Sequence, residues 1–341
     1  MEDIMTLNMN LGANSYDIIL EHGAIQKASE YLNLNRKVFV ITDDGVPAEY
    51  ADIVCAQCKH PVKAVVAQGE DSKGFPTFEK LCRMMLENGF TRTDAVVAVG
   101  GGVVGDLAGF TAASFMRGID FYNIPTTLLS EVDSSIGGKT AINLGGVKNI
   151  IGAFHQPKCV LIDPDVLKTL PKRQIANGLA ESIKMATTFD AELFELIENK
   201  DIAENLDIII ERSLRIKKYV VEHDEKEKGL RKVLNFGHTI GHGIESYEGL
   251  HGLYHGECVA LGMLPMCEGE IRERLLRVLE KAELPTKLDF DADRVFEAIT
   301  HDKKLDGETL NVIYVPEIGK FEMKKTPLSD FRTVLEEVFC K

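Results

Sequence analysis

Histidines gather in one short part of the chain at a spacing that suits metal binding. His238 and His242 are four residues apart, as are His251 and His255, so four of the nine histidines fall within 18 residues. Residues i and i+4 share one face of a helix, where two imidazoles can bind one ion. A single pair of this kind is often a hydrogen-bonded structural feature. Two pairs so close together favour a metal site.

A carboxylate elsewhere in the chain could complete this site. Catalytic metal sites with an open coordination position usually take three protein ligands, often histidines together with a carboxylate. Glu181 stands in the apolar helical segment 178–184, where an unpaired buried carboxylate would be costly. The alternative for Glu181 is an ion pair with Lys184 at i+3, which stabilises an exposed helix by only about 0.2–0.5 kcal/mol.

A glycine-rich segment follows a strongly apolar run. Residues 94–99 lead into Gly100-Gly101-Gly102-Val103-Val104-Gly105, which satisfies the dinucleotide-binding pattern Gly-x-Gly-x-x-Gly and precedes a helix-like segment. Glycines let the backbone approach a pyrophosphate, and a helix N-terminus offers it unpaired N–H groups. The alternative is a tight strand-to-helix turn without a ligand. Because the glycines come mid-chain, the pattern predicts a variant sheet in which Asp43 could hold the ribose or the adenine end.

A second glycine pair resembles the end of an ATP-binding loop. Gly137-Gly138-Lys139-Thr140 has the Gly-Lys-Thr signature, but Asp133 stands where that pattern requires a glycine. Lys139 is better interpreted as a point charge for a different anion.

Cations cluster near these motifs although acidic residues predominate overall, and three of them, Lys148, Lys184 and Arg231, border apolar or glycine-rich sequence. A solvated surface is one interpretation of these positions, and a small anionic substrate is the other. The residues concerned are Lys139, Lys148, Lys184, Lys217, Arg231, Lys303 and Lys304. Taken alone, the residue types and spacings indicate an NAD-like cofactor, a divalent metal and a small anionic substrate.

The elements that must position these residues change in kind along the chain. Short β-branched runs at 38–41, 62–66, 95–99 and 120–124 alternate with helical patterns such as 75–88, which is typical of a parallel α/β sheet. From about Pro171 the apolar spacing becomes helical, with one isolated strand-like run at 310–315. We therefore predict an α/β domain over residues 1–160, a mostly α-helical domain over 161–341, and a ligand cleft between them.

Composition excludes several classes of protein. The 341 residues carry 39 Lys and Arg against 53 Asp and Glu, a net charge of −14, which argues against general binding to nucleic acid or acidic membranes. With no signal peptide or membrane segment visible, we expect a cytoplasmic protein whose seven cysteines are reduced thiols. The Cys55-x-x-Cys58 pair has no partner pair at zinc-ribbon spacing, so a helical pair of small apolar residues is favoured over a redox or metal role.

Longer motifs resemble those of the 3-dehydroquinate synthase family, and the likeness runs roughly from Asp43 to Lys304. They are the segments 125–129, 132–140, 148–154, 178–184, 234–242 and 255–260. The resemblance implies an N-terminal Rossmann-like NAD-binding α/β domain followed by a mostly α-helical metal-binding domain. It also implies NAD and a zinc or cobalt ion as cofactors, and a cytoplasmic homodimer. The implied substrate is 3-deoxy-D-arabino-heptulosonate 7-phosphate (DAHP), converted in the shikimate pathway to 3-dehydroquinate and phosphate by transient oxidation, phosphate elimination, reduction and aldol closure.

The resemblance also assigns residues to roles. The metal ligands would be Glu181, His238 and His255, with His242 transferring protons and His251 outside the ligand set. Residues for catalysis and substrate anions would be Lys139, Lys148, Asn149, Lys184, Lys217, Arg231, Asn235 and Lys303, together with Arg117 reaching across a dimer interface. Cofactor-binding residues would be Asp43, Glu70, Lys73, Gly101, Gly102, Asp106, Thr126, Thr127, Asp133, Lys139, Lys148 and Thr169.

The chain departs from the family pattern at two places beside the expected site. Glu131 replaces a neutral residue, and Leu144-Gly145-Gly146-Val147 replaces a turn that usually contains proline. The alternatives to a 3-dehydroquinate synthase are a related sugar-phosphate cyclase, a metal-dependent polyol dehydrogenase and a non-catalytic binding module. The cationic set favours a substrate that carries a carboxylate, and the retained histidines argue against a module without activity.

Overall fold

The computed structural model describes residues 4–248, 252–287, 292–300 and 309–339. The chain divides into two compact units, Met1–Pro171 (unit 1) and Lys172–Lys341 (unit 2). The boundary expected from the sequence, between residues 160 and 161, precedes this division and falls within a strand of unit 1.

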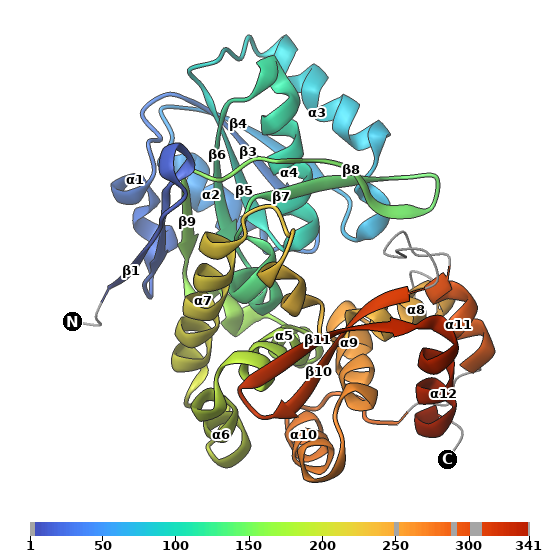
Figure 1. Ribbon diagram of the computed structural model, residues 1–341. Coiled ribbons are helices and arrows are strands. Elements are labelled where there is room, and N and C mark those ends of the chain that lie inside the picture. Colours follow the sequence, from blue (N-terminus) through green and yellow to red (C-terminus); the bar gives the residue numbers. More distant parts are fainter. Residues whose placement is uncertain (1–3, 249–251, 288–291, 301–308, 340–341) are drawn as a thin grey trace. The chain divides into compact units, whose positions relative to one another are not determined.

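Unit 1 is built on a seven-stranded sheet of order β1-β2-β9-β6-β5-β3-β4. The pairs β2–β9, β9–β6, β6–β5, β5–β3 and β3–β4 are parallel, and only β1 runs antiparallel to its neighbour among the described strands of this sheet. The strands are β1 (Met5–Met9), β2 (Tyr16–Leu20), β3 (Lys37–Asp43), β4 (His60–Val66), β5 (Ala95–Gly100), β6 (Asp120–Pro125) and β9 (Cys159–Ile162). The hairpin β7 (Lys139–Leu144) and β8 (Val147–Phe154) lies outside this sheet. Figure 1 shows the arrangement.

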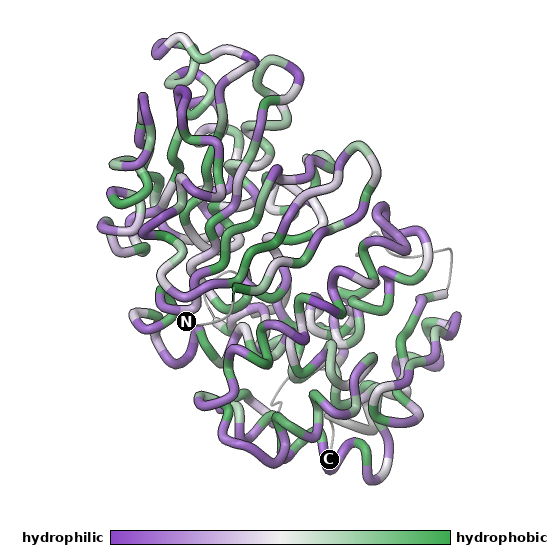
Figure 2. Tube along the Cα trace, turned by 90° about the vertical axis from the view of Figure 1, so that its left-hand side faces the viewer, coloured by the Kyte–Doolittle hydropathy of each residue, from purple (hydrophilic) through white to green (hydrophobic). Residues whose placement is uncertain are grey.

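Apolar side chains cover both faces of the parallel sheet. In β3, Val38 and Val40 pack with α1 (Ala28–Tyr31) and α2 (Ala48–Ala56), whereas Phe39 and Ile41 pack on the opposite face. That second face is covered by α3 (Phe75–Glu87) and α4 (Gly102–Ser114), with Ile142 of the hairpin. Successive side chains of a strand point to opposite faces, so a strand buried on both sides is a continuous apolar run. Figure 2 shows these hydrophobic strands.

Unit 2 consists mainly of helices, as the sequence predicts. They are α5 (Lys172–Phe189), α6 (Ala191–Asn199), α7 (Leu206–His223), α8 (His238–Glu248), α9 (His255–Met263), α10 (Gly269–Lys281), α11 (Ala292–Thr300) and α12 (Leu328–Phe339). The strand expected at 310–315 is β10 (Thr309–Glu317), which pairs antiparallel with β11 (Lys320–Pro327). Helix α5 packs against α6, α7 and α9, so it is the central helix of the described part of this unit.

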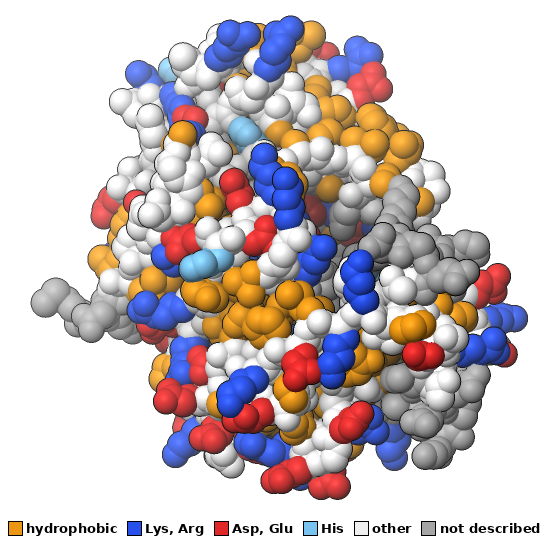
Figure 3. All heavy atoms as spheres, in the orientation of Figure 1, with side chains coloured by type: hydrophobic (Ala, Val, Ile, Leu, Met, Phe, Trp, Pro, Cys, Tyr) orange, Lys and Arg blue, Asp and Glu red, His pale blue; other side chains and the backbone are white. Residues whose placement is uncertain are grey.

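Surface charges of both signs are interspersed on the face drawn in Figure 3. None of the described helices is long and apolar enough to cross a membrane.

Candidate metal centre and dinucleotide site

Three side chains of unit 2 form the arrangement expected of metal ligands. The Oε1 atom of Glu181 lies 3.7 Å from Nε2 of His238 and 3.7 Å from Nε2 of His255. Two ligand atoms bound at 2.0–2.1 Å with tetrahedral angles would be about 3.4 Å apart, so the observed separations fit a common ion. The sequence predicts this trio, and the structure brings all three residues together.

Close helix packing places these ligands. Glu181 lies in the middle of α5, and His238 and His255 are the first residues of α8 and α9. Gly237, just before α8, has φ +77°, and a Cβ there would lie 2.7 Å from the backbone oxygen of Val259. A Cβ on Gly262 would lie 2.0 Å from the backbone oxygen of Gly237. Only glycine permits this approach, which holds the N-terminus of α8 against α9.

Glu181 also forms the ion pair that the sequence analysis treats as its alternative role. Its Oε2 accepts a hydrogen bond from Nζ of Lys184, and both side chains are almost fully buried. The ion pair uses one carboxylate oxygen, whereas the two histidines face the other. The two roles are therefore compatible at this position.

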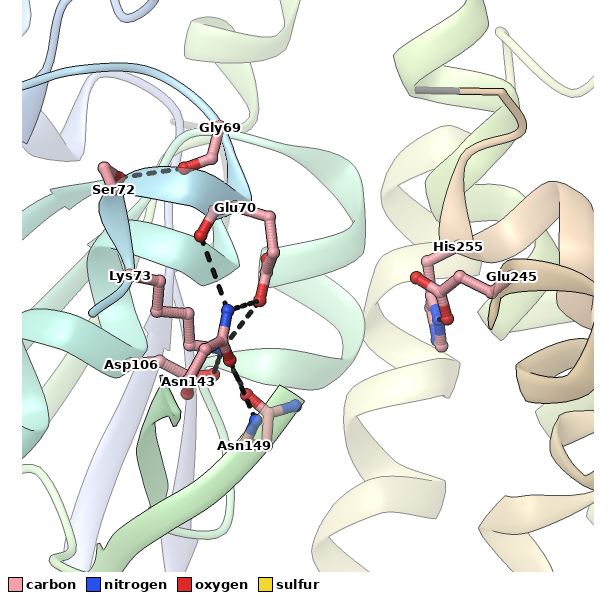
Figure 4. Close-up of polar contacts among 9 residues, drawn as sticks. All are labelled: Gly69, Glu70, Ser72, Lys73, Asp106, Asn143, Asn149, Glu245 and His255. Atoms are coloured by element: carbon pink, nitrogen blue, oxygen red, sulfur yellow. Dashed lines mark hydrogen bonds and ion pairs between the residues drawn. The ribbon is translucent and has the colours of Figure 1, made fainter. Parts of the chain in front are cut away.

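The histidine rings are oriented by further hydrogen-bonding groups. Nδ1 of His238 lies 3.2 Å from the backbone oxygen of Phe236, which leaves Nε2 toward Glu181. Nδ1 of His255 lies 3.4 Å from Oε2 of Glu245 (Figure 4). Burial alone would lower the pKa of His255, but the carboxylates of Glu181 and Glu245 outweigh it and raise the pKa to about 9.

Glu245 is a site residue that the sequence analysis missed. Together with His242 and His255 it forms a second group whose ligand atoms lie within 4.8 Å of one another. The signal was present, because positions 238, 242 and 245 follow i, i+4 and i+7 spacing on one face of α8. His242 itself lies with its ring centroid 5.2 Å from that of His238 and 6.0 Å from that of His255.

Buried cations accompany the metal trio in unit 2. Lys184 on α5, Lys217 on α7 and Arg231 in the 3-10 turn η7 (Leu230–Asn235) are all at most 6% exposed. These three elements pack against one another. Three buried cations thus lie on mutually packed elements of a chain that is acidic overall, and one of them, Lys184, is paired with Glu181. Such cations are the groups that an anionic substrate requires.

A carboxylate shapes the loop that presents Arg231 and Asn235. Asp224 accepts backbone hydrogen bonds from Lys228 (2.8 Å), Gly229 (2.6 Å) and Arg231 (3.0 Å). Partial burial would raise the pKa of Asp224, but these N–H donors outweigh it and hold the pKa below its usual value. Asn235 donates from Nδ2 to Glu227 at 2.7 Å. Lys303 and His251 lie outside the described residues.

In unit 1, the residues expected to bind the dinucleotide follow the carboxyl ends of the parallel strands. Asp43 ends β3, Glu70 and Lys73 follow β4, and the glycines follow β5. Thr126, Thr127 and Asp133 come after β6, and Thr169 comes after β9. The chain passes from β3 outward to β4 and then back to β5 on the other side of β3, so the direction of winding switches between β3 and β5. Open α/β sheets bind ligands at such a switch point.

The glycine loop has the geometry of an anion site. Gly101 is the N-cap of α4, without a side-chain cap, and the first turn of that helix contains no acidic residue. A Cβ on Gly102 would lie 2.9 Å from Oγ of Ser134, and one on Gly105 would lie 3.2 Å from Nδ2 of Asn123. The N–H groups of this helix end and the close backbone packing around it fit a pyrophosphate.

Lys73 is the centre of a polar cluster beside that loop (Figure 4). Its ammonium lies 2.5 Å from Oδ2 of Asp106, 2.5 Å from Oδ1 of Asn149 and 3.7 Å from Oε1 of Glu70. Asn143 on β7 joins the cluster by donating to Glu70 and by accepting from the backbone N–H of Asn149. Burial would lower the pKa of Lys73, but Asp106 and Glu70 outweigh it and raise the pKa. The cluster thus links the loop after β4, helix α4 and the β7–β8 hairpin.

The remaining predicted residues of unit 1 are more exposed. Lys139 begins β7, where a helix would follow in an ATP-binding loop, so the structure supports the rejection of that motif. Lys148 is half-buried on β8, and Asn149 is exposed with φ +53°. Arg117 is exposed and has φ +70°.

Other residues of unit 1 serve local structure in the first instance. Asp43 accepts hydrogen bonds from the backbone N–H groups of Gly45 and Val46, and Thr169 contacts the hydroxyl of Tyr50 at 2.9 Å.

Burial raises the pKa of Cys58 to about 12, which argues against a reactive thiolate in the Cys-x-x-Cys pair.

Comparison with known proteins agrees with this geometry. Residues 63–177 match the domain family described as 3-dehydroquinate synthase N-terminal, and residues 178–305 match 3-dehydroquinate synthase C-terminal. A 3-dehydroquinate synthase of Streptococcus thermophilus (strain ATCC BAA-491 / LMD-9) is 42% identical over 98% of this chain and 100% of its own length.

Solved structures with this fold include two sugar cyclases. A 2-deoxy-scyllo-inosose synthase complexed with carbaglucose-6-phosphate, NAD+ and Co2+ has a TM-score of 0.89 at 26% identity, covering 98% of this chain and 100% of its own. A 2-epi-5-epi-valiolone synthase from Streptomyces hygroscopicus subsp. jinggangensis 5008, with NAD+ and Zn2+ bound, has a TM-score of 0.86 at 25% identity, covering 95% and 96%. A probable glycerol dehydrogenase from Sinorhizobium meliloti 1021 (TM-score 0.62, 17% identity, covering 95% and 96%) shows the fold alone.

The fold and the site define a two-unit protein of the cyclase type, with a Rossmann-like α/β unit and a helical unit that carries a Glu-His-His trio. Within that class, the chain belongs to the 3-dehydroquinate synthase family.

Proposed function

We propose that this protein is a 3-dehydroquinate synthase, a carbon–oxygen lyase that converts DAHP to 3-dehydroquinate and inorganic phosphate. The observation that carries the proposal is the combination, in one unit, of the Glu181-His238-His255 trio with the buried cations Lys184 and Arg231. A site built for a neutral polyol has no need of such cations. Full-length similarity to curated synthases supports the same activity.

The cofactors are NAD and a divalent metal ion, zinc or cobalt. Glu181, His238 and His255 would hold the metal, since their facing atoms have the spacing of ligands around one ion. NAD would lie along the strand ends of unit 1, with its pyrophosphate at the N-terminus of α4 and with Lys73 and Asp106 nearby. When bound, these groups supply a transient hydride acceptor and the Lewis acidity that favours an alkoxide at the oxidised carbon.

The chain's own residues bind the substrate and move its protons. Lys184, Lys217 and Arg231 neutralise the carboxylate and phosphate, and the planar guanidinium suits bidentate binding of either anion. Asn235 donates hydrogen bonds to the same substrate, as do Lys139, Lys148, Asn149 and Lys303. His242 accepts and returns a proton at an imidazole nitrogen, a role that histidine side chains commonly fill in general acid–base catalysis.

The protein is also proposed to be a homodimer in the cytoplasm. Positive φ values occur at three successive residues, Met116, Arg117 and Gly118. This conformation is strained for the two of them that are not glycine, and Arg117 is exposed. The nearby Phe154 exposes 48% of its surface. A partner subunit covering this segment would receive Arg117. The described cysteines are all free, which suits a reducing compartment.

The test is product formation from matched substrates. DAHP should yield 3-dehydroquinate and phosphate in equal amounts. The corresponding ketose phosphate without the carboxylate should react at least 100-fold more slowly in kcat/KM, because the charge-assisted hydrogen bonds to the substrate carboxylate would be lost. Preference for the substrate without a carboxylate would instead indicate a related cyclase. NADH accumulation from polyols without phosphate release would indicate a dehydrogenase.

A further inference from the structure

Helix α5 contacts the start of α9 at three points along one of its faces. Arg173, Asn177 and Glu181 follow one another at i, i+4 and i+8, a spacing that keeps side chains on the same side of a helix. Glu181 faces His255, as described above. The other two residues contact the chain on either side of that histidine.

Arg173 makes a two-point ion pair with Glu257, two residues after His255. Its Nε donates to Oε1 of Glu257 and its Nη2 donates to Oε2, both at 2.7 Å. Nη2 also donates to the backbone oxygen of Gly252 at 3.2 Å, and the guanidinium lies 4.2 Å from the ring centroid of Tyr254. Arg173 therefore holds the chain before and after the ligand.

Glu257 and Asn177 satisfy N–H groups at the start of α9. The side chain of Glu257 accepts from the backbone N–H of Tyr254 at 2.7 Å, and Oδ1 of Asn177 accepts from that of Gly256 at 2.7 Å. The first N–H groups of a helix have no partner inside it, so these two bonds fix where α9 begins. A Cβ on Gly256 would lie 2.0 Å from the backbone oxygen of Asn177, so the two backbones are in direct contact.

We infer that Arg173, Asn177 and Glu257 are positioning residues that hold His255 at metal-binding distance from Glu181. None of the three faces the common point of the ligand trio, and the Arg173 side chain is 51% exposed. Solvent screens the Arg173 end of this pair, whereas Glu257 is 8% exposed, so the pair makes only part of its contribution as a stabilising charge contact. Its two parallel hydrogen bonds, however, fix the orientation of the Arg173 and Glu257 side chains relative to each other. The role concerns metal binding by the trio and does not depend on which substrate the proposed function names.

The experiment measures metal affinity in the full-length protein. Arg173→Met and Glu257→Gln, purified without metal, are titrated with Co2+ while the visible absorption of the bound ion is recorded, and with Zn2+ by chelator competition. Supporting groups around metal ligands typically change affinity 10–100-fold. We expect a loss in that range, a changed Co2+ spectrum, partial recovery in Arg173→Lys, and NAD affinity equal to that of the unmodified protein.

A matched control is available in the same unit. Arg274 makes a similar two-point pair with Glu198, at 3.1 and 2.6 Å, away from the ligands. Arg274→Met should retain full metal affinity. The melting temperature of the metal-free proteins separates folding from positioning, and Arg173→Met and Arg274→Met should melt within a few degrees of each other.

The double variant Arg173→Met/Glu257→Gln completes a double-mutant cycle. Its loss of metal affinity should be smaller than the sum of the losses in the two single variants, because both substitutions break the same ion pair. Metal affinity and Co2+ spectra that match the unmodified protein in Arg173→Met would overturn the inference. Equal losses in Arg173→Met and Arg274→Met would also overturn it, because they would reflect general destabilisation. A failure of the proposed synthase activity alongside the expected metal results would leave the positioning role intact.

Discussion

Removing the ammonium of Lys73 should destabilise unit 1 strongly. Lys73 is 4% exposed and lies 2.5 Å from Asp106, which is 20% exposed. Breaking a buried ion pair by removing one partner costs about 3–5 kcal/mol, because the other charge stays buried without compensation. Since Asp106 retains some contact with solvent, we expect the lower end of that range, about 3 kcal/mol, for Lys73→Met.

A loss of this size can be measured by thermal unfolding. For a unit of this length each kcal/mol lowers the melting temperature by roughly 2–4 °C, so Lys73→Met should melt roughly 6–12 °C lower. Adding Asp106→Asn should recover part of the loss, because it removes the uncompensated carboxylate. NAD affinity should fall in both variants, since the cluster lies beside the glycine loop.

Lys63→Met provides the control. Lys63 pairs with Asp52 at 2.5 Å in the same unit, but the two side chains are 34% and 58% exposed. Removing this exposed partner should change the melting temperature little, because solvent screens exposed ion pairs. Equal melting temperatures for Lys73→Met and Lys63→Met would show that the buried ion pair of Lys73 stabilises unit 1 no more than an exposed one.

Three further predictions concern unit 2. His242→Ala should retain metal and NAD binding while kcat falls by roughly 10²–10⁴-fold; steady-state kinetics with equilibrium dialysis check this, and undiminished turnover would contradict the proton-transfer role. Glu245→Gln should weaken metal binding by roughly 10–100-fold, because a carboxylate that fixes a ligating imidazole is lost; chelator competition measures it, and unchanged affinity would contradict the role. For Asp224, whose pKa is lowered in the folded state, the stabilisation is fully present above about pH 4 and is lost as pH falls through the folded value. The difference in unfolding free energy between the unmodified protein and Asp224→Asn should therefore be largest near pH 7 and shrink below pH 4, as urea titrations can test; a difference independent of pH would refute the assignment.

The sequence predicts the parts of the fold in which local pattern and burial agree. The strands β3, β5 and β6 are largely apolar runs because both of their faces are buried, whereas β4 lies at the sheet edge and buries only Ala64 and Val66. Helix α3 has a clear helical period that ends near Asn88-Gly89. Strands β1, β2 and β9 were missed, since they are only four or five residues long. The β7–β8 hairpin was missed because it pairs outside the main sheet and keeps much of β8 exposed.

The site was predictable where residue types alone point to chemistry. Unusual histidine spacing and a carboxylate in an apolar segment indicated a metal site, and the resemblance to the family then selected His238 and His255 as the ligands beside Glu181. Glu245 was missed although it follows the same helix face, because a glutamate on a helix is most often solvated. The ion pair of Arg173 with Glu257 joins residues more than 80 positions apart in the sequence. No local sequence pattern indicates such a contact.

The most direct test follows phosphate and NADH together in one reaction. The metal-loaded protein is mixed with NAD and DAHP while inorganic phosphate release and absorbance at the NADH band are recorded, with a chelator-treated sample as control. The proposed function predicts many turnovers of chelator-sensitive phosphate release with no net accumulation of NADH, because the hydride returns to the substrate in each cycle. Stoichiometric NADH accumulation, or phosphate release that persists without metal, would contradict it.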